Sequence, residues 1–246
     1  MFAIGCSYFA SRMQKANSQR QAVEAIRDGH AYFYHQWKWD QPSTASGVGA
    51  TEEIGYRWAR DLLGDDFFFN IDSAVLNHAS DKDLECLGGF PSLRRLDITW
   101  PEITDAGLEH VRDLTNIEAL DLNVFFNDGA NVTDAGLRNL SGLTQLRFLN
   151  LGCTNVSGEG LVHLSGLMRL EELGLTKTRV ADDGLRYLNG LRSMRRLYLS
   201  DTKITDDGLS QLDGMEHLEI LDLSGTAITD ACPVSQNPCQ SLGLKA

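Results

Sequence analysis

Residues 146–215 decide the fold, because one pattern runs through them three times without a gap. They read LRFLNLGCTNVSGEGLVHLSGLMR (146–169), LEELGLTKTRVADDGLRYLNGLRS (170–193) and MRRLYLSDTKITDDGLSQLDGM (194–215), so each step is 24 residues. The common pattern is L-x-x-L-x-L-x-x-T-x-[IV]-x-D-x-G-L-x-x-L-x-G-L. A fixed period in the twenties with this leucine spacing predicts an array of stacked repeats.

Each unit predicts a short strand followed by a short helix. In L-x-x-L-x-L the last two leucines alternate, so both point to one face of a strand. Leu209 and Leu212 lie three residues apart, as on a helix that Thr205 or Asp206 would cap. Stacking buries leucines that a single unit cannot bury, so we expect an α/β solenoid with short parallel strands on the concave side and helices on the convex side. Hydroxyls at the turn after each strand should bond to the backbone, at Thr154, Thr178, Thr202 and Thr226.

The array extends in both directions from this stretch. The first clear unit begins at Leu93, and the second begins at Ile117 and carries the insertion VFFNDGAN (124–131) after its strand. The unit that begins at Leu218 fails where Cys232-Pro233 replaces the expected Gly-Leu. The predicted division is an N-terminal helix and aromatic cap region at 1–68, leucine-rich repeats at 69–230 and a loose tail at 231–246.

The N-terminal region predicts an α+β cap. Residues 11–28 and 51–63 predict helices, and the aromatic run HAYFYHQWKWD (30–40) predicts one or two strands. The apolar segment MFAIGCSYFA (1–10) is shorter than the roughly 20 residues that a bilayer-spanning helix needs. Two interpretations stay open, the first turns of an amphipathic helix or the end of a membrane anchor whose beginning is missing. The location is accordingly open between the cytoplasm and a membrane surface.

Composition argues against several classes of function. The net charge of -12 disfavours binding to nucleic-acid phosphates, which needs a basic surface. Five scattered cysteines indicate reduced thiols and show no zinc-binding spacing. The sequence contains no G-x-S-x-G, P-loop, H-E-x-x-H or dinucleotide-binding motif. We therefore expect no catalytic residues, no cofactor and no metal site.

The phrase T-K-I-T-D-D-G-L (202–209) resembles the cysteine-containing subclass of leucine-rich repeats, close to the repeats of F-box substrate receptors. It is similar also to bacterial proteins built from TDAGL units, which occur here at 104–108 and 133–137. In some of those proteins a membrane anchor, a helix and an aromatic region ending in LLGDDFF precede the array, and residues 62–68 read LLGDDFF. The resemblance covers about residues 11–230 and implies a leucine-rich repeat solenoid. No F-box-like segment is recognisable, and the last repeat is broken.

The repeat positions predict which side chains stand on the concave face. Polar and aromatic residues there could form a protein-binding surface, since Tyr and Arg are common in binding hot spots, although the face could also be merely solvated. The residues of this candidate surface are Arg95, Asp97, Asp121, Phe148, Asn150, Glu172, Arg196 and Tyr198. A second series alternates in charge without exception and is interpreted as support for the register: Arg94, Glu118, Arg147, Glu171, Arg195 and Glu219.

Aromatic residues also gather at one rim of the predicted solenoid. Trp100 leaves the strand of the first clear unit, and Phe125 and Phe126 lie in the insertion of the next. Insertions between repeats form loops that are often functional, so these residues are candidates for partner binding. The alternative is that they pack on one another or against the cap region and close the gap that the insertion makes.

Function is therefore predicted as a non-catalytic protein–protein interaction module with an unidentified protein partner. The alternative is a substrate-receptor subunit of a ubiquitin-ligase-like complex, which would need a recruiting segment. The broken last repeat leaves an unpaired edge, so self-association through residues 218–228 is a further expectation.

Overall fold

The fold is a curved solenoid built on one open sheet, in a computed structural model that describes residues 31–34, 72–99, 102–123, 131–212 and 215–229. Eight strands lie in the sheet in the order of the chain. The first pairs antiparallel with the second, and all later pairs are parallel. The strands are β1 (Ala31–Tyr34), β2 (Ser73–Asn77), β3 (Arg95–Thr99), β4 (Ala119–Asp121), β5 (Phe148–Asn150), β6 (Glu172–Gly174), β7 (Arg196–Tyr198) and β8 (Ile220–Asp222).

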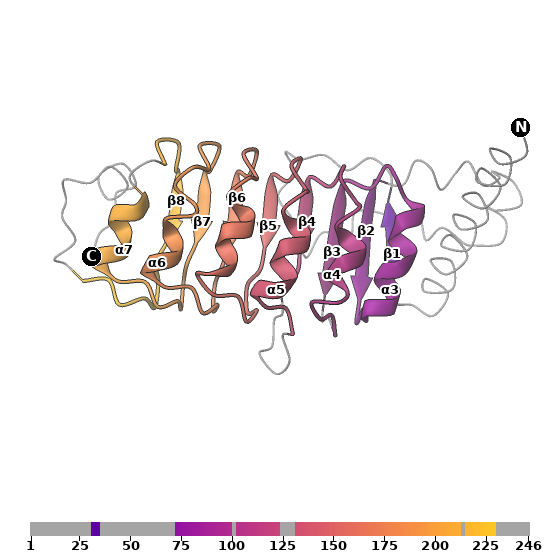
Figure 1. The fold of residues 1–246 in the computed structure, drawn as a ribbon, viewed down its shortest axis with the longest axis horizontal. Helices are drawn as coiled ribbons and strands as arrows, with labels where there is room; N and C mark the ends of the chain where they lie inside the picture. The colour runs from indigo at the N-terminus through magenta and orange to yellow at the C-terminus, as the bar shows by residue number, and fades with distance from the viewer. Residues whose placement is uncertain (1–30, 35–71, 100–101, 124–130, 213–214, 230–246) are drawn as a thin grey trace, which may run out of the picture.

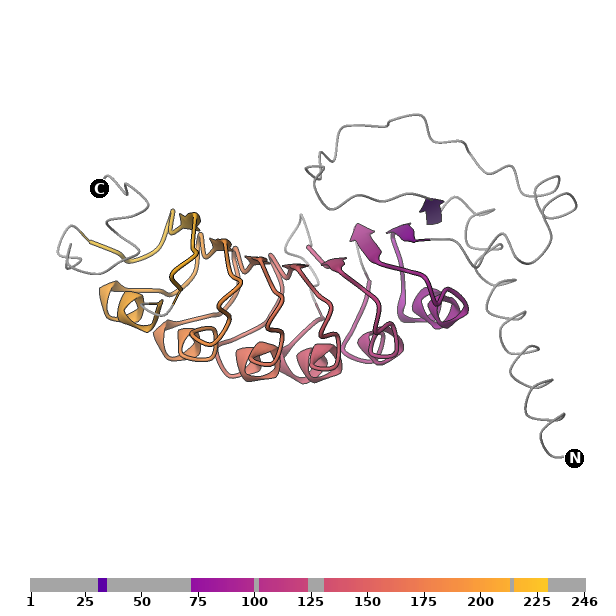
Figure 2. The ribbon, with the colours of Figure 1, turned by 90° about the horizontal axis from the view of Figure 1, so that it is seen from above.

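Short helices return the chain from each strand to the next, and Figures 1 and 2 show them side by side on the convex side of the arc. A 24-residue unit leaves room for only about one turn of α-helix, often continued by a 3₁₀ turn. The α-helices are α3 (Asp81–Glu85), α4 (Leu108–Val111), α5 (Asp134–Leu137), α6 (Asp182–Leu185) and α7 (Asp206–Leu209). The 3₁₀ helices are η2 (Cys86–Gly89), η3 (Arg138–Leu140), η4 (Gly160–Leu164) and η5 (Ser210–Leu212).

The core is one continuous apolar row between the sheet and the helices, from Ala74 to Leu221. Every apolar position that the repeat pattern marks between Leu146 and Met215 is buried. Burying one such side chain contributes about 1.5–3 kcal/mol, so stacking the units is the main source of stability. The expected solenoid, with strands inside the curve and helices outside it, is confirmed.

Buried threonines tie each strand to the turn that follows it. The hydroxyls of Thr154, Thr178 and Thr202 donate to the carbonyl oxygens of the leucines three residues earlier, at 2.6, 2.7 and 2.6 Å. These three are almost the only buried polar side chains among the described residues. The backbone bonds expected of this repeat position are confirmed, and they satisfy carbonyl groups that the bend removes from the sheet ladder.

A second polar contact links consecutive units at the helix starts. In five units the aspartate at the start of the helical segment accepts two hydrogen bonds from the next unit, one from a backbone N–H and one from a hydroxyl. For example, Thr205 donates its N–H to Asp182 Oδ1 (2.8 Å) and its hydroxyl to Asp182 Oδ2 (2.6 Å). We call this contact the aspartate staple, and its pairs are Asp81–Thr104, Asp105–Thr133, Asp134–Ser157, Asp182–Thr205 and Asp206–Thr229.

The staple explains the glycine that lies three residues after the hydroxyl donor. A Cβ placed on Gly208 would lie 2.2 Å from Asp182 Oδ1, so only glycine leaves room for the carboxylate. One step lacks the staple, because Gly158 stands where the other units have aspartate and Ala181 stands where they have Thr or Ser. There the backbones approach closely instead, and a Cβ on Gly184 would lie 2.4 Å from the Cα of Gly158. At this step the sequence thus lacks both the carboxylate acceptor, at Gly158, and the hydroxyl donor, at Ala181.

The prediction that Thr205 or Asp206 caps this helix is confirmed for the position of Thr205, although not through a side-chain bond. Thr205 does occupy the N-cap of α7, but its hydroxyl makes no cap bond and donates to Asp182 instead. At α5, Thr133 does both, since its oxygen also accepts from the N–H of Ala135 at 3.2 Å. The hydroxyl therefore always reaches the neighbouring unit and caps its own helix at some units only, which sequence-local reasoning could not show.

The turns after the strands adopt a left-handed backbone at one repeat position. Cys153, Lys177 and Asp201 have φ angles of 60°, 56° and 55°, and Gly225 follows at 71°. Each of the three non-glycine residues donates its N–H to a carbonyl of the next unit, at 2.8, 2.9 and 2.8 Å. Non-glycine residues in this region cost roughly 1–2 kcal/mol, which these hydrogen bonds offset.

Several expectations for the chain ends fall outside the described residues. These are the helices at 11–28 and 51–63, the segment 1–10, the tail 231–246 and the boundaries at 68/69 and 230/231. Part of the aromatic run 30–40 forms β1, so a strand there is confirmed, and it pairs with β2 at the N-terminal edge of the parallel strands. Within the described ranges, no helix has the length and apolar character to cross a membrane.

Candidate functional site

Two rows of side chains run across the concave face, because alternate residues of each three-residue strand point away from the core. The leucine in the middle of each strand is buried, while its two neighbours form the rows. The strand register aligns each row from β3 to β8. The first concave row is Arg95, Ala119, Phe148, Glu172, Arg196 and Ile220, and the second concave row is Asp97, Asp121, Asn150, Gly174, Tyr198 and Asp222.

A hollow of about 360 Å³ opens in the concave face between β4 and β7. Gly174 interrupts the second concave row and lies between Asn150 and Tyr198 in the register. A Cβ on Gly174 would lie 2.5 Å from Asn150 Oδ1, so any larger residue would displace the asparagine side chain. The hollow is lined by Asp121, Asn123, Phe148, Asn150, Gly152, Cys153, Glu172, Gly174, Thr176, Lys177 and Tyr198.

Asp121 is the most perturbed carboxyl group of this face. Its Oδ1 accepts the N–H of Asn123 at 3.0 Å, as Asn150 Oδ1 accepts the N–H of Gly152 at 3.1 Å. Burial raises the pKa of Asp121 to about 6 against the lowering effect of the Asn123 hydrogen bond, and the charge of Asp97 raises it further. Asp97 is its register neighbour on β3. Two carboxyl groups thus share a partly dehydrated corner of the face.

The arginines of the first concave row are occupied by acidic partners. Arg95 forms an ion pair of 2.8 Å with Asp97 on the same strand, and Arg196 pairs with Glu172 of β6 at 2.6 Å. Burial is the largest influence on Asp97 and raises its pKa despite the Arg95 pair. No ion pair joins Asp121 to a cation among the described residues. Asp121 is therefore the acidic group of the hollow whose charge the structure leaves least compensated.

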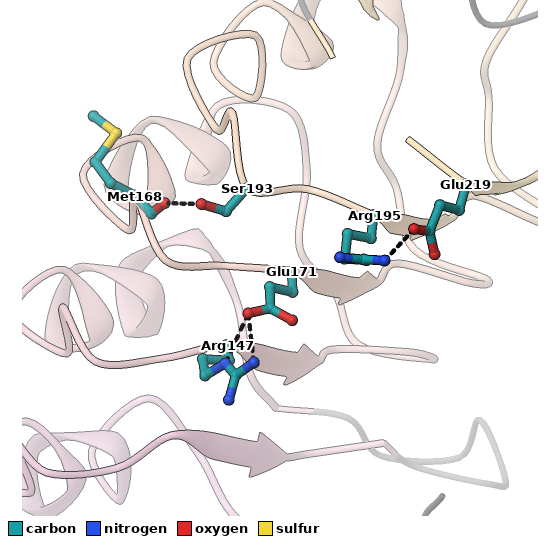
Figure 3. A network of polar contacts seen from close by, with 6 residues as sticks. All are labelled: Arg147, Met168, Glu171, Ser193, Arg195 and Glu219. Carbon is teal, nitrogen blue, oxygen red and sulfur yellow. Dashed lines mark hydrogen bonds and ion pairs between the residues drawn. The ribbon is translucent and has the colours of Figure 1, made fainter. Parts of the chain in front are cut away.

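The alternating charge series lies just before the strands and joins neighbouring units in pairs. Arg94 contacts Glu118 at 2.8 Å, Arg147 contacts Glu171 at 2.7 Å, and Arg195 pairs with Glu219. Figure 3 shows the second and third pairs in line along the array, with Ser193 donating to the carbonyl oxygen of Met168 nearby. These contacts join consecutive units, in keeping with support of the register. Exposed pairs of this kind contribute at most about 1 kcal/mol each.

The structure brings together five of the predicted site residues, which line the hollow: Asp121, Phe148, Asn150, Glu172 and Tyr198. Arg95, Asp97 and Arg196 stand beside it in the same two rows. Trp100, Phe125 and Phe126 lie outside the described residues. Sequence reasoning missed Asn123, Gly152 and Lys177, which follow their strands by two or three residues. A glycine inside a row of larger residues, as at Gly174, is the signal that could have located the hollow.

Comparison with known families agrees with the geometry. The family model described as a leucine-rich repeat matches residues 91–110, 142–165, 190–212 and 214–231. The chain contains leucine-rich repeats. The matched segments fall on the stacked units, with their buried leucines and parallel strands. No curated protein matches the sequence of this leucine-rich repeat chain.

Several solved structures are similar to this leucine-rich repeat chain. Internalin C2 from Listeria monocytogenes is 22% identical with a TM-score of 0.52, over 68% of this chain and 77% of that one. A second internalin of that organism is 21% identical (TM-score 0.40), over 65% of this chain and 55% of its own. A TDR receptor is 17% identical (TM-score 0.42), over 58% of this chain and 24% of that one. The first of these likenesses supports the fold alone.

Proposed function

We propose that this leucine-rich repeat protein is a non-catalytic interaction module that binds a protein partner on the two concave rows from β3 to β8. The observation that carries the proposal is the hollow between β4 and β7, where aromatic and charged side chains converge on a rigid parallel sheet. Backbone bonds and buried leucines hold each strand in place, so the rows keep their arrangement before a partner arrives. Preorganisation of this kind lowers the entropic cost of binding.

The residues of the concave face fit protein binding better than catalysis. Phe148 and Tyr198 offer large apolar areas with few rotatable bonds, which are common anchors in interfaces. In the described part of the chain, no group of three or more His, Cys, Asp or Glu side chains could hold a metal ion. The described residues and the comparisons contain no observation that favours the alternative of a ubiquitin-ligase substrate receptor.

The test is photo-crosslinking from the concave face in the native source, followed by affinity measurements. A photoreactive amino acid at position 198 should capture a defined partner, whereas the same group at Val162 on the convex η4 should not. The affinity of the identified partner is then measured for the pair Phe148→Ser and Tyr198→Ser and for the control pair Val162→Ser and Met168→Ser. Loss of two aromatic anchors should weaken binding by at least about 10-fold.

Equal affinity of the concave and control pairs, with folding intact, would refute the concave face as the binding surface. The aromatic rim is tested in the same assay by Phe125→Ser with Phe126→Ser. An unchanged partner profile for that pair would remove the rim from the proposal and leave the concave rows in it.

A further inference from the structure

We propose that the hollow above Gly174 receives the cationic side chain of an arginine or lysine from an extended segment of the partner. The inference rests on the proposed function, since it names the chemical class that the concave face recognises. Three observations carry it: the size and floor of the hollow, the balance of its charges and the position of its aromatic residues.

The hollow is large enough to hold one long side chain. Its volume of about 360 Å³ lies at the small end of the range of ligand pockets, about 300–1,000 Å³. Gly174 and Gly152 both belong to its lining, and in both places a Cβ would press on an asparagine oxygen. Both glycines are buried, and the lining beside them includes the Asn150 amide and the Asp121 carboxylate, whose oxygens can accept hydrogen bonds from a guanidinium or ammonium group.

The charges of the lining favour a cation at the β4 side. The charged lining residues are Asp121, Glu172 and Lys177. Glu172 is already neutralised by Arg196 at 2.6 Å, and Lys177 follows β6, two strands away from Asp121 on β4. Among the described residues Asp121 therefore supplies a negative charge that no ion pair neutralises. Burial raises its pKa to about 6 and the charge of Asp97 adds to this, although the hydrogen bonds of Asn123 and Asn150 and the charge of Arg95 lower it. An incoming cation would relieve this cost, whereas an anion would increase it.

The aromatic lining adds selectivity for a cationic side chain. Phe148 on β5 and Tyr198 on β7 belong to the lining on opposite sides of β6, which contributes only glycine to the second concave row. Aromatic faces attract guanidinium and ammonium groups, and arginine stacks on them especially well. A carboxylate combined with such faces recognises a positive charge and an elongated apolar stem at once.

The test uses blocked pentapeptides Gly-Gly-X-Gly-Gly, with X as arginine, lysine or the neutral isostere citrulline, titrated into the full chain. Binding is followed by NMR through the backbone amides of Gly152 and Gly174, both of which line the hollow. The arginine peptide should shift both amides saturably and bind at least about 10-fold more tightly than the citrulline peptide. Lysine should fall between them, because it lacks the planar fork.

Two isosteric variants provide matched controls. Asp121→Asn should lower the affinity for the arginine peptide by about 10-fold, because it removes the charge while keeping an oxygen that accepts the N–H of Asn123. Asp183→Asn makes the same change at an exposed position of α6, away from the concave rows, and should leave the affinity within about 2-fold. Lowering the pH from 7.5 to 5 should weaken binding to the wild type, since Asp121 is protonated, but not to Asp121→Asn.

Four results would each overturn the inference. The citrulline peptide could bind as tightly as the arginine peptide, or Asp121→Asn could bind the arginine peptide with full affinity. The shifts could avoid Gly152 and Gly174, or binding could fail to saturate up to about 10 mM peptide. None of these outcomes touches the proposed function, which fails only if the Phe148→Ser and Tyr198→Ser pair retains the partner. If that pair retains the partner while the arginine peptide still shifts the two amides selectively, the proposed function fails although the hollow does bind a cationic side chain.

Discussion

The aspartate staple should contribute strongly to stability, and Asp182→Ala is the substitution that tests it. Asp182 accepts two hydrogen bonds from Thr205, at 2.8 Å from the N–H and 2.6 Å from the hydroxyl, in a partly buried position. Hydrogen bonds to a charged acceptor contribute about 1.5–3 kcal/mol each. The freed Thr205 hydroxyl can turn to cap α7, as Thr133 does at α5, which recovers part of the loss. We expect the free energy of unfolding to fall by about 2 kcal/mol.

The assay is urea unfolding followed by circular dichroism, with Asp183→Ala as the matched control. Asp183 is the next residue on the same helix and is exposed, so its removal should cost less than about 0.5 kcal/mol. A double-mutant cycle with Thr205→Ala isolates the contact, and its coupling energy should be about 1–2 kcal/mol. If Asp182→Ala and Asp183→Ala prove equally stable, the staple would be a geometric feature without energetic weight, and the reasoning would be refuted.

Three further predictions concern the glycines, the hollow and the left-handed turns. Gly208→Ala should destabilise by about 1–3 kcal/mol, because its Cβ meets the Asp182 carboxylate, whereas Gly166→Ala has nothing within 4 Å and should be nearly neutral; thermal unfolding of both variants checks this. Since folding raises the pKa of Asp121 to about 6, the folded state holds a proton that the unfolded state has lost between pH 4 and 6, and stability from this group falls as pH rises through that window. Asp121→Asn should therefore gain up to about 3 kcal/mol over the wild type between pH 4 and 7.5, and a pH-independent difference in urea unfolding would contradict it. Lys177→Gly should stabilise by about 0.5–1 kcal/mol, because φ is 56° there, while Lys203→Gly, outside the left-handed turns, should not; a loss of stability at 177 would argue against backbone strain.

Much of the fold could be predicted because the spacing of the leucines in each repeat indicates which residues are buried. The positions of Leu197, Leu199 and Leu209 mark the strand and the helix of their unit, and all three are buried as expected. The concave rows follow from the alternation of side chains along each strand, so candidates such as Phe148 and Tyr198 could be placed on one face from the sequence alone. Regular spacing makes each of these inferences local to one unit.

Contacts between units were harder to foresee. Thr205 looks like a helix cap in its own unit, but its hydroxyl donates to Asp182, 23 residues earlier. Likewise, the glycine of T-D-x-G-L looks like a helix-start preference, although Gly208 is required by the carboxylate of the preceding unit. The joint loss of donor and acceptor at Gly158 and Ala181 carried this information in the sequence, but only the stacking reveals that the equivalent positions meet in the other units, as Asp182 and Thr205 do.

The architecture follows from the sequence alone, because a 24-residue period of leucines can bury its apolar face only by stacking copies of one strand–helix unit. The sequence also indicates which residues share the concave face, since alternation along a strand is a local property. The place of the hollow on that face, and the charge there that is least compensated, follow from how the units pack. Those properties depend on the side chains of three or four adjacent strands at once, as the gap at Gly174 and the burial of Asp121 show.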